Sequence, residues 1–144
     1  MIAKDIINAA IAQGACGKAF QMAEKVNSWE ELASALFKPQ SREYCALHNF
    51  PSLEMFKDTS TELRKYGVFF DAGEIESENP VNFAVVGNTI ANITYSGTDA
   101  LHRLIVMHGA KARVRATNYA VVVVLKIGEG CEVEFDNDET AKIL

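Results

Sequence analysis

Histidines are the side chains in this sequence best suited to act as general acids or bases, because imidazole titrates near neutral pH. His102 and His108 lie in a segment, residues 100–128, that contains no acidic side chain, and Asp99 is the carboxylate beside it. We interpret both as surface or turn histidines. The chain also lacks glycine-rich phosphate loops, H-E-x-x-H and G-x-S-x-G. The sequence therefore predicts no catalytic residue and no cofactor, and favours a protein that is not an enzyme.

Metal ligands occur only in incomplete sets. Cys45 and His48 form a Cys-x-x-His pair, half of a zinc site, but no second ligand pair accompanies it. Residues 136–139 (Asp-Asn-Asp-Glu) carry oxygen ligands suited to calcium, yet they lack the glycine and distal glutamate of an EF-hand loop. The cysteines, Cys16, Cys45 and Cys131, are odd in number and widely spaced, which does not fit a disulfide framework. We therefore expect no metal site and free thiols.

A short basic segment could bind a single-stranded nucleic acid. Lys111, Arg113 and Arg115 alternate along it, with Tyr95 and Tyr119 on either side. Basic and acidic side chains balance in residues 1–66, however, so the net charge of −5 belongs to residues 67–144. Since phosphate contacts supply most nucleic-acid affinity, a nucleic-acid partner is not expected.

The N-terminal part, residues 1–66, has the apolar spacing of several short helices. Apolar residues recur three and four positions apart, and Ser28 with Glu31 fits a capping box at the start of one helix. Pro39 is expected to end that helix, and Gly67 suits the left-handed position after the last one.

The C-terminal part, residues 67–144, repeats with a period near 21. β-branched and polar residues alternate, and Gly109-Ala110 recurs as Gly130-Cys131. In a parallel solenoid, residues one period apart stack in neighbouring strands. Two apolar rows are then predicted to point inward: Ala91, Ala112 and Val133, and Ile93, Val114 and Phe135.

The same offset gives each cation of residues 111–115 an acidic neighbour. The predicted outward pairs are Lys111 with Glu132, Arg113 with Glu134, and Arg115 with Asp136. Opposite charges are favourable neighbours across a sheet, so this charge ladder supports the parallel register. We predict an α+β protein: an N-terminal helical cap followed by a parallel β-solenoid of about three coils. An antiparallel β-sandwich is the alternative fold.

A helical head, a linker near Tyr66-Gly67-Val68 and Ala/Val-rich coils such as residues 116–123 occur together in this chain. In this combination the chain resembles a family of uncharacterised bacterial and phage-borne proteins. The resemblance implies the helical head, the short β-solenoid and a bacterial or phage origin. It implies no activity and no site residues.

The longest apolar run, residues 119–125, is far shorter than the ~20 residues that span a bilayer. Gln13 and Gly14 interrupt the N-terminal apolar pattern, so we expect no export signal and a cytoplasmic protein.

The last coil is expected to be a contact surface, with Cys131, Ile143 and Leu144 as interface candidates, because an open sheet end invites pairing. The sequence thus favours a non-catalytic interaction or assembly module, homo-oligomeric through this end. One alternative is a binding protein for an extended ligand, a glycan or a nucleic-acid strand. Another is a β-helix enzyme acting on polysaccharide, which would need an unpaired carboxylate pair within residues 129–139.

Overall fold

The computed structural model describes residues 28–38, 45–57 and 60–144. The chain divides into two compact units, Met1–Val68 and Phe69–Leu144. The predictions for Pro39 and for the thiol of Cys16 fall on residues outside the described ranges.

The described part of the first unit is helical. It contains α3 (Trp29–Phe37), a helical turn at residues 45–48, α5 (Leu53–Lys57) and α6 (Ser60–Arg64). At the start of α3 the Ser28 hydroxyl accepts a hydrogen bond from the Glu31 backbone N–H at 3.1 Å, as the capping-box prediction requires. The Glu31 carboxylate accepts from the Ser28 hydroxyl instead of from its backbone N–H. Gly67, with φ of 88°, follows α6 in the left-handed conformation.

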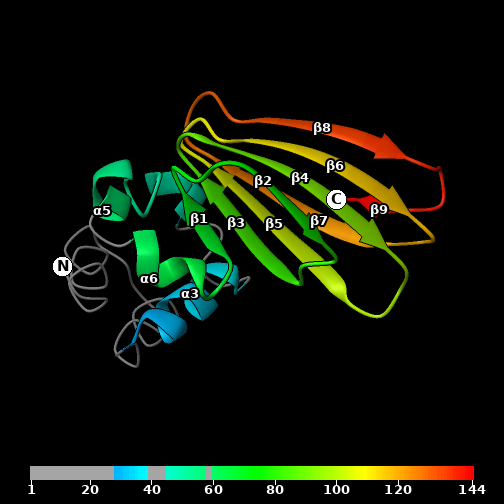
Figure 1. The fold of residues 1–144 in the computed structure, drawn as a ribbon, viewed down its shortest axis with the longest axis horizontal. Coiled ribbons are helices and arrows are strands. Elements are labelled where there is room, and N and C mark those ends of the chain that lie inside the picture. Colours follow the sequence, from blue (N-terminus) through cyan, green and yellow to red (C-terminus); the bar gives the residue numbers. More distant parts are fainter. Residues whose placement is uncertain (1–27, 39–44, 58–59) are drawn as a thin grey trace. The chain divides into compact units, whose positions relative to one another are not determined.

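The second unit consists of two parallel sheets, whose strands alternate along the chain (Figure 1). The five-stranded sheet has the order β1-β3-β5-β7-β9 and the four-stranded sheet the order β2-β4-β6-β8. The strands are β1 (Val68–Phe70), β2 (Gly73–Glu78), β3 (Asn82–Val86), β4 (Thr89–Ser96), β5 (Leu101–Met107), β6 (Lys111–Thr117), β7 (Val121–Ile127), β8 (Glu132–Asn137) and β9 (Lys142–Ile143).

Parallel pairing follows the register that the repeat predicts. Ala91 pairs with Ala112 and Ala112 with Val133, so β4, β6 and β8 are stacked one period apart. The described pairings of β2 to β9 are all parallel, and the antiparallel sandwich is therefore wrong. The repeat does not extend to β2, since Gly73 pairs with Thr89 across a shorter connection.

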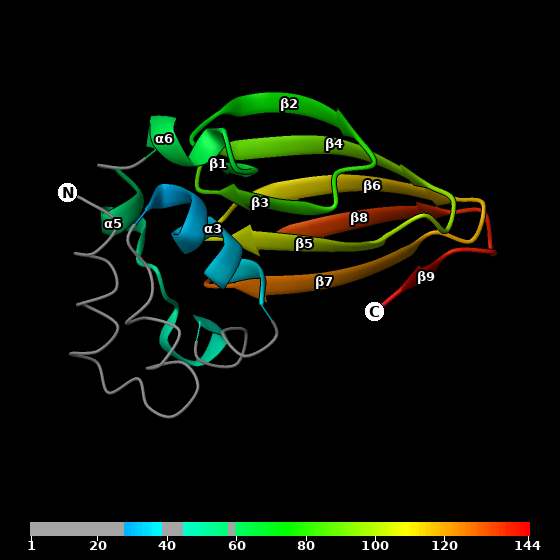
Figure 2. The same ribbon diagram turned by 90° about the horizontal axis from the view of Figure 1, so that it is seen from below.

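The core of this unit lies between the two sheets, which form neighbouring layers in Figure 2. Ala91, Ala112, Ile93 and Val114 are all buried, as the inward rows predict. Phe135 differs: it is in register with Val114 but is 46% exposed. The register places Phe135 in the predicted inward row, but the residue is incompletely covered because β8 is the edge strand of its sheet.

Tight turns join the strands. Gly128 lies in one of them with φ of 85°, and a Cβ built on it would come within 2.8 Å of the His108 Nδ1 atom. A residue with a side chain would therefore meet both backbone strain and a steric clash at this position.

Candidate functional site: the charged face and open edge of the four-stranded sheet

Strand geometry sorts the outward residues of the four-stranded sheet into rows. Successive side chains point to opposite faces, so every second residue of β2, β4, β6 and β8 lies on the outer face. We call the following three rows the charged face: Glu74, Ile90, Lys111 and Glu132; Glu76, Asn92, Arg113 and Glu134; Glu78, Thr94, Arg115 and Asp136. The charged face is therefore acidic on both edge strands, uncharged on β4 and cationic on β6.

The ladder predicted from the sequence lies on this face. The Lys111 Nζ atom is 3.5 Å from the Glu132 Oε2 atom, and the Arg113 Nε atom is 3.9 Å from the Glu134 Oε2 atom. All four side chains are more than half exposed, so each pair contributes only about 0–1 kcal/mol to stability. These pairs favour the register but do not hold the fold together.

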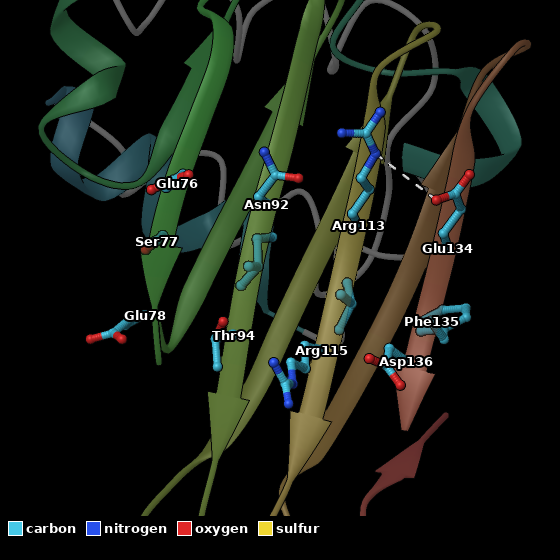
Figure 3. Close-up of a pocket in the computed structure, with 12 residues that line it drawn as sticks. Glu76, Ser77, Glu78, Asn92, Thr94, Arg113, Arg115, Glu134, Phe135 and Asp136 are labelled. Carbon is cyan, nitrogen blue, oxygen red and sulfur yellow. Dashed lines mark ion pairs between the residues drawn. The ribbon is translucent and has the colours of Figure 1, made fainter. Parts of the chain in front are cut away.

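Arg115 has a different environment from the other two cations. It is in register with Asp136, but no ion pair within 4.0 Å joins it to any described residue. Figure 3 shows its guanidinium on β6 between Thr94 of β4 and Asp136 of β8. Arg115 is therefore a cation of the charged face that an external ligand could reach.

Sequence reasoning missed the contribution of β2. Glu74 accepts a hydrogen bond from the Asn92 amide at 3.0 Å, and its Oε1 atom is 3.8 Å from the Arg113 Nη1 atom. Arg113 thus has carboxylates on both sides. The alternation of acids along residues 74–78 was visible, but these residues lie outside the 21-residue register.

A shallow groove of about 720 Å³ runs over the charged face (Figure 3). Its polar lining comes from Glu76, Ser77, Glu78, Asn92, Thr94, Arg113, Arg115, Glu134 and Asp136. Carboxylates outnumber guanidiniums in this lining, which disfavours a phosphate chain and suits a ligand rich in hydroxyl groups. The groove is thus a candidate binding surface for a neutral, polar ligand.

The outer edge of β8 is the second candidate surface. The backbone N–H groups of Glu132 and Asp138 donate to β6-side carbonyls, those of Ala110 and Ala116. Because N–H directions alternate along a strand, the N–H groups of Val133 and Phe135 point to the opposite edge. No described strand pairs with that edge, and β8 lies at the outside of the sheet in Figure 1.

The three interface candidates from the sequence have different surroundings. Cys131 is half-buried, and its thiol lies 3.4 Å from the Val106 and Ile127 carbonyl oxygens. Ile143 packs against the core, whereas Leu144 is 67% exposed. Leu144 is nevertheless tied to β7 through its backbone. Of the three, Leu144 is the residue whose side chain is most available to a partner.

The histidine prediction is half wrong. His102 is buried, since it pairs in register with Val122 and faces the core, where its ring packs 4.6 Å from that of Tyr95. Its Nδ1 atom is 2.9 Å from the Pro80 carbonyl oxygen, which can only accept, so Nδ1 carries the proton. His108 lies in a turn, with φ of 53°. Neither residue lines the groove of the charged face.

Tyr95 is fully buried, and its hydroxyl has no hydrogen-bond partner in the described residues. Desolvation by burial raises the pKa of Tyr95 above its ordinary value. The hydroxyl therefore stays neutral inside the core.

Of the candidate calcium ligands at residues 136–139, Asp136 lies on β8 and Asp138 is engaged in the turn that follows. The Asp138 carboxylate accepts hydrogen bonds from the Thr140 hydroxyl at 2.6 Å and from the Thr140 and Asn118 backbone N–H groups. The Thr140 hydroxyl is the main cause that lowers the pKa of Asp138. The described residues contain no group of three or more His, Cys, Asp or Glu side chains that could hold a metal ion.

The Cys45 and His48 pair lies in the first unit. Cys45 is buried and His48 is exposed. Desolvation by burial raises the pKa of the Cys45 thiol to about 12. A buried, protonated thiol is a poor metal ligand, because metals bind the thiolate.

No protein-family model, curated protein or solved structure was found to match the chain. The resemblance to bacterial and phage-borne proteins stays a prediction. No described helix is long and apolar enough to cross a membrane.

Proposed function

We propose that the protein is a non-catalytic interaction module, and that it binds through the C-terminal end of its two sheets. The observation that carries this proposal is the open edge of β8, where Phe135 is 46% exposed beside the half-buried Val133. Unpaired backbone groups next to exposed apolar side chains form a surface that other chains can join.

A second copy of the chain is the partner expected from the sequence. Two β8 strands paired edge to edge would bring their carboxylates together, which is unfavourable. A contact between copies is therefore better made on the β9 side, through the exposed Leu144. Such a contact would be isologous, the commonest closed arrangement.

Light scattering at micromolar concentration tests this self-assembly. We expect a dimer that dissociates in the Leu144→Asp variant. Leu47→Asp is the matched control, because Leu47 is 76% exposed and lies in the helical unit. A strict monomer, unchanged by either substitution, would refute self-assembly and leave only a partner of different sequence.

Binding of an extended glycan is the second candidate function, and the groove over the charged face favours it. Carboxylate, guanidinium and amide groups line the groove, and these planar groups can make paired hydrogen bonds to sugar hydroxyls. An NMR titration with neutral oligosaccharides should shift the amide signals of Thr94 and Arg115. Binding should be lost in Arg115→Ala, and the absence of any shift on β4 and β6 would refute this candidate.

The enzyme alternative requires an unpaired pair of carboxylates among the acids of residues 129–139. Glu132 and Glu134 each have a cationic neighbour, and Asp138 is hydrogen-bonded within its turn. Glu129, Asp136 and Glu139 are exposed and form no ion pair within 4.0 Å with a described residue, so the enzyme alternative now depends on these three acids. The helical cap, the number of coils, the bacterial or phage origin and the cytoplasmic location stay predictions.

A further inference from the structure

The open edge of β8 has backbone groups to which an additional strand could pair. Val133, Phe135 and Asn137 alternate with the residues that bond to β6, so their N–H and C=O groups point to the free edge. An extended chain laid along this edge in parallel could pair with all three residues.

The side chains on the two faces of β8 determine which side chains a chain paired with this edge must carry. Glu132, Glu134 and Asp136 lie on the outer face, whereas Val133 and Phe135 lie on the inner face and are incompletely covered. A strand in register therefore needs cations at alternate positions on its outer side. Between them it needs apolar residues that cover Val133 and Phe135.

The protein already contains one strand of this kind. Strand β6, Lys-Ala-Arg-Val-Arg-Ala-Thr, pairs with the opposite edge of the same β8, with its cations beside the β8 acids. Strand β6 thus shows that β8 can pair with a strand in which basic and apolar residues alternate.

A second copy of the four-stranded sheet is a poor occupant of this edge. Its edge strands are β2 and β8, and both carry acids on the outer face: Glu74, Glu76 and Glu78 on β2, and Glu132, Glu134 and Asp136 on β8. Either strand would place carboxylates beside carboxylates. Charge on an edge strand is a common protection against self-pairing.

From these observations we infer that the β8 edge binds an extended segment of a different protein, with Lys or Arg at alternate positions and small or apolar residues between them. The inference rests on the proposed function, because it names the partner class for that same C-terminal end. The partner adds a fifth strand to the four-stranded sheet.

The probe is a synthetic, end-blocked peptide with the sequence of residues 111–117. One control peptide carries Gln in place of Lys and Arg, and another has the same composition with the three cations consecutive. Binding is measured by NMR titration of the full chain. We expect shifts concentrated at Val133, Phe135 and Asn137, and binding about tenfold tighter than for either control, since three ion pairs are at stake. High ionic strength should remove this preference.

Variants of the protein separate the edge from the groove. The triple variant Glu132→Gln, Glu134→Gln, Asp136→Asn should bind the basic and Gln peptides equally. Glu76→Gln, on the opposite edge strand, should keep the preference. Circular dichroism checks that both variants remain folded, which is expected because these side chains are exposed.

The outcomes discriminate clearly between the inference and the proposed function. Equal binding of basic and Gln peptides at β8 would overturn the charge selection and leave the interaction module intact. Shifts on Asn92 and Thr94 instead of β8 would place the peptide in the groove and overturn the inference. If no peptide binds, the inference fails. If the protein is also a strict monomer, the self-assembly of the proposed function fails as well.

Discussion

Two valines in the four-stranded sheet test whether the β8 edge is open in solution. Val114 on β6 and Val133 on β8 both point inward, but Val114 is 2% exposed whereas Val133 is only half-buried. Threonine matches valine in shape and replaces one methyl group by a hydroxyl. The substitution therefore changes polarity at nearly constant volume.

The expected losses follow from the access of each hydroxyl to water. A buried hydroxyl without a full partner costs about 1–3 kcal/mol, so Val114→Thr should lower the free energy of unfolding by about 2 kcal/mol. Val133→Thr should cost less than about 1 kcal/mol, because its hydroxyl can be hydrated at the open edge.

Urea denaturation followed by the far-ultraviolet circular dichroism of the strands measures both losses. Tryptophan fluorescence would be a poor substitute, since the single tryptophan, Trp29, lies in the helical unit. Equal losses at positions 114 and 133 would refute the open edge. If the loss at position 133 grew with protein concentration, another copy would be covering β8.

Three further predictions concern single contacts. Arg113→Glu should lower stability by less than about 1 kcal/mol and Glu134→Arg in the same chain should restore part of it; strictly additive thermal shifts would show that the two side chains are not coupled. Gly128→Ala should destabilise the protein more than Gly97→Ala, because both glycines have positive φ but only a Cβ at position 128 would meet the His108 imidazole. Equal melting temperatures of the two variants would contradict that contact. Cys45 should remain unalkylated at pH 8 in the folded protein, since its thiol stays protonated below a pKa of about 12. Mass spectrometry measures the alkylation, and rapid modification of Cys45 would show that its thiol is accessible.

The parallel register was predictable from the sequence because equivalent positions of successive coils need the same kind of residue, apolar inside and polar outside. Ala112 pairs with Ala91 and Val133 in the structure, as the period of 21 predicts. The ion neighbours Lys111 with Glu132 and Arg113 with Glu134 follow from the same offset. Local pattern suffices here, since stacked positions share one environment.

Prediction failed at residues whose surroundings differ from those of the equivalent residues in the neighbouring coils. The offset between paired residues of β2 and β4 is shorter than the repeat, so the period could not predict that Glu74 lies beside Arg113. Phe135 has the pattern of a core residue, but its exposure depends on the absence of a described strand beyond β8.

His102 is the opposite case, a residue that was predicted at the surface or in a turn but is buried. Residues 100–128 around it contain no acid, which suggested a surface or turn position. The structure buries it between the sheets, because the partner of its Nδ1 is the carbonyl of Pro80 and its ring packs on Tyr95. Sequence alone determined which residues repeat and therefore stack. Only the tertiary structure decided which stacked side chains are covered, because burial depends on neighbours from other strands.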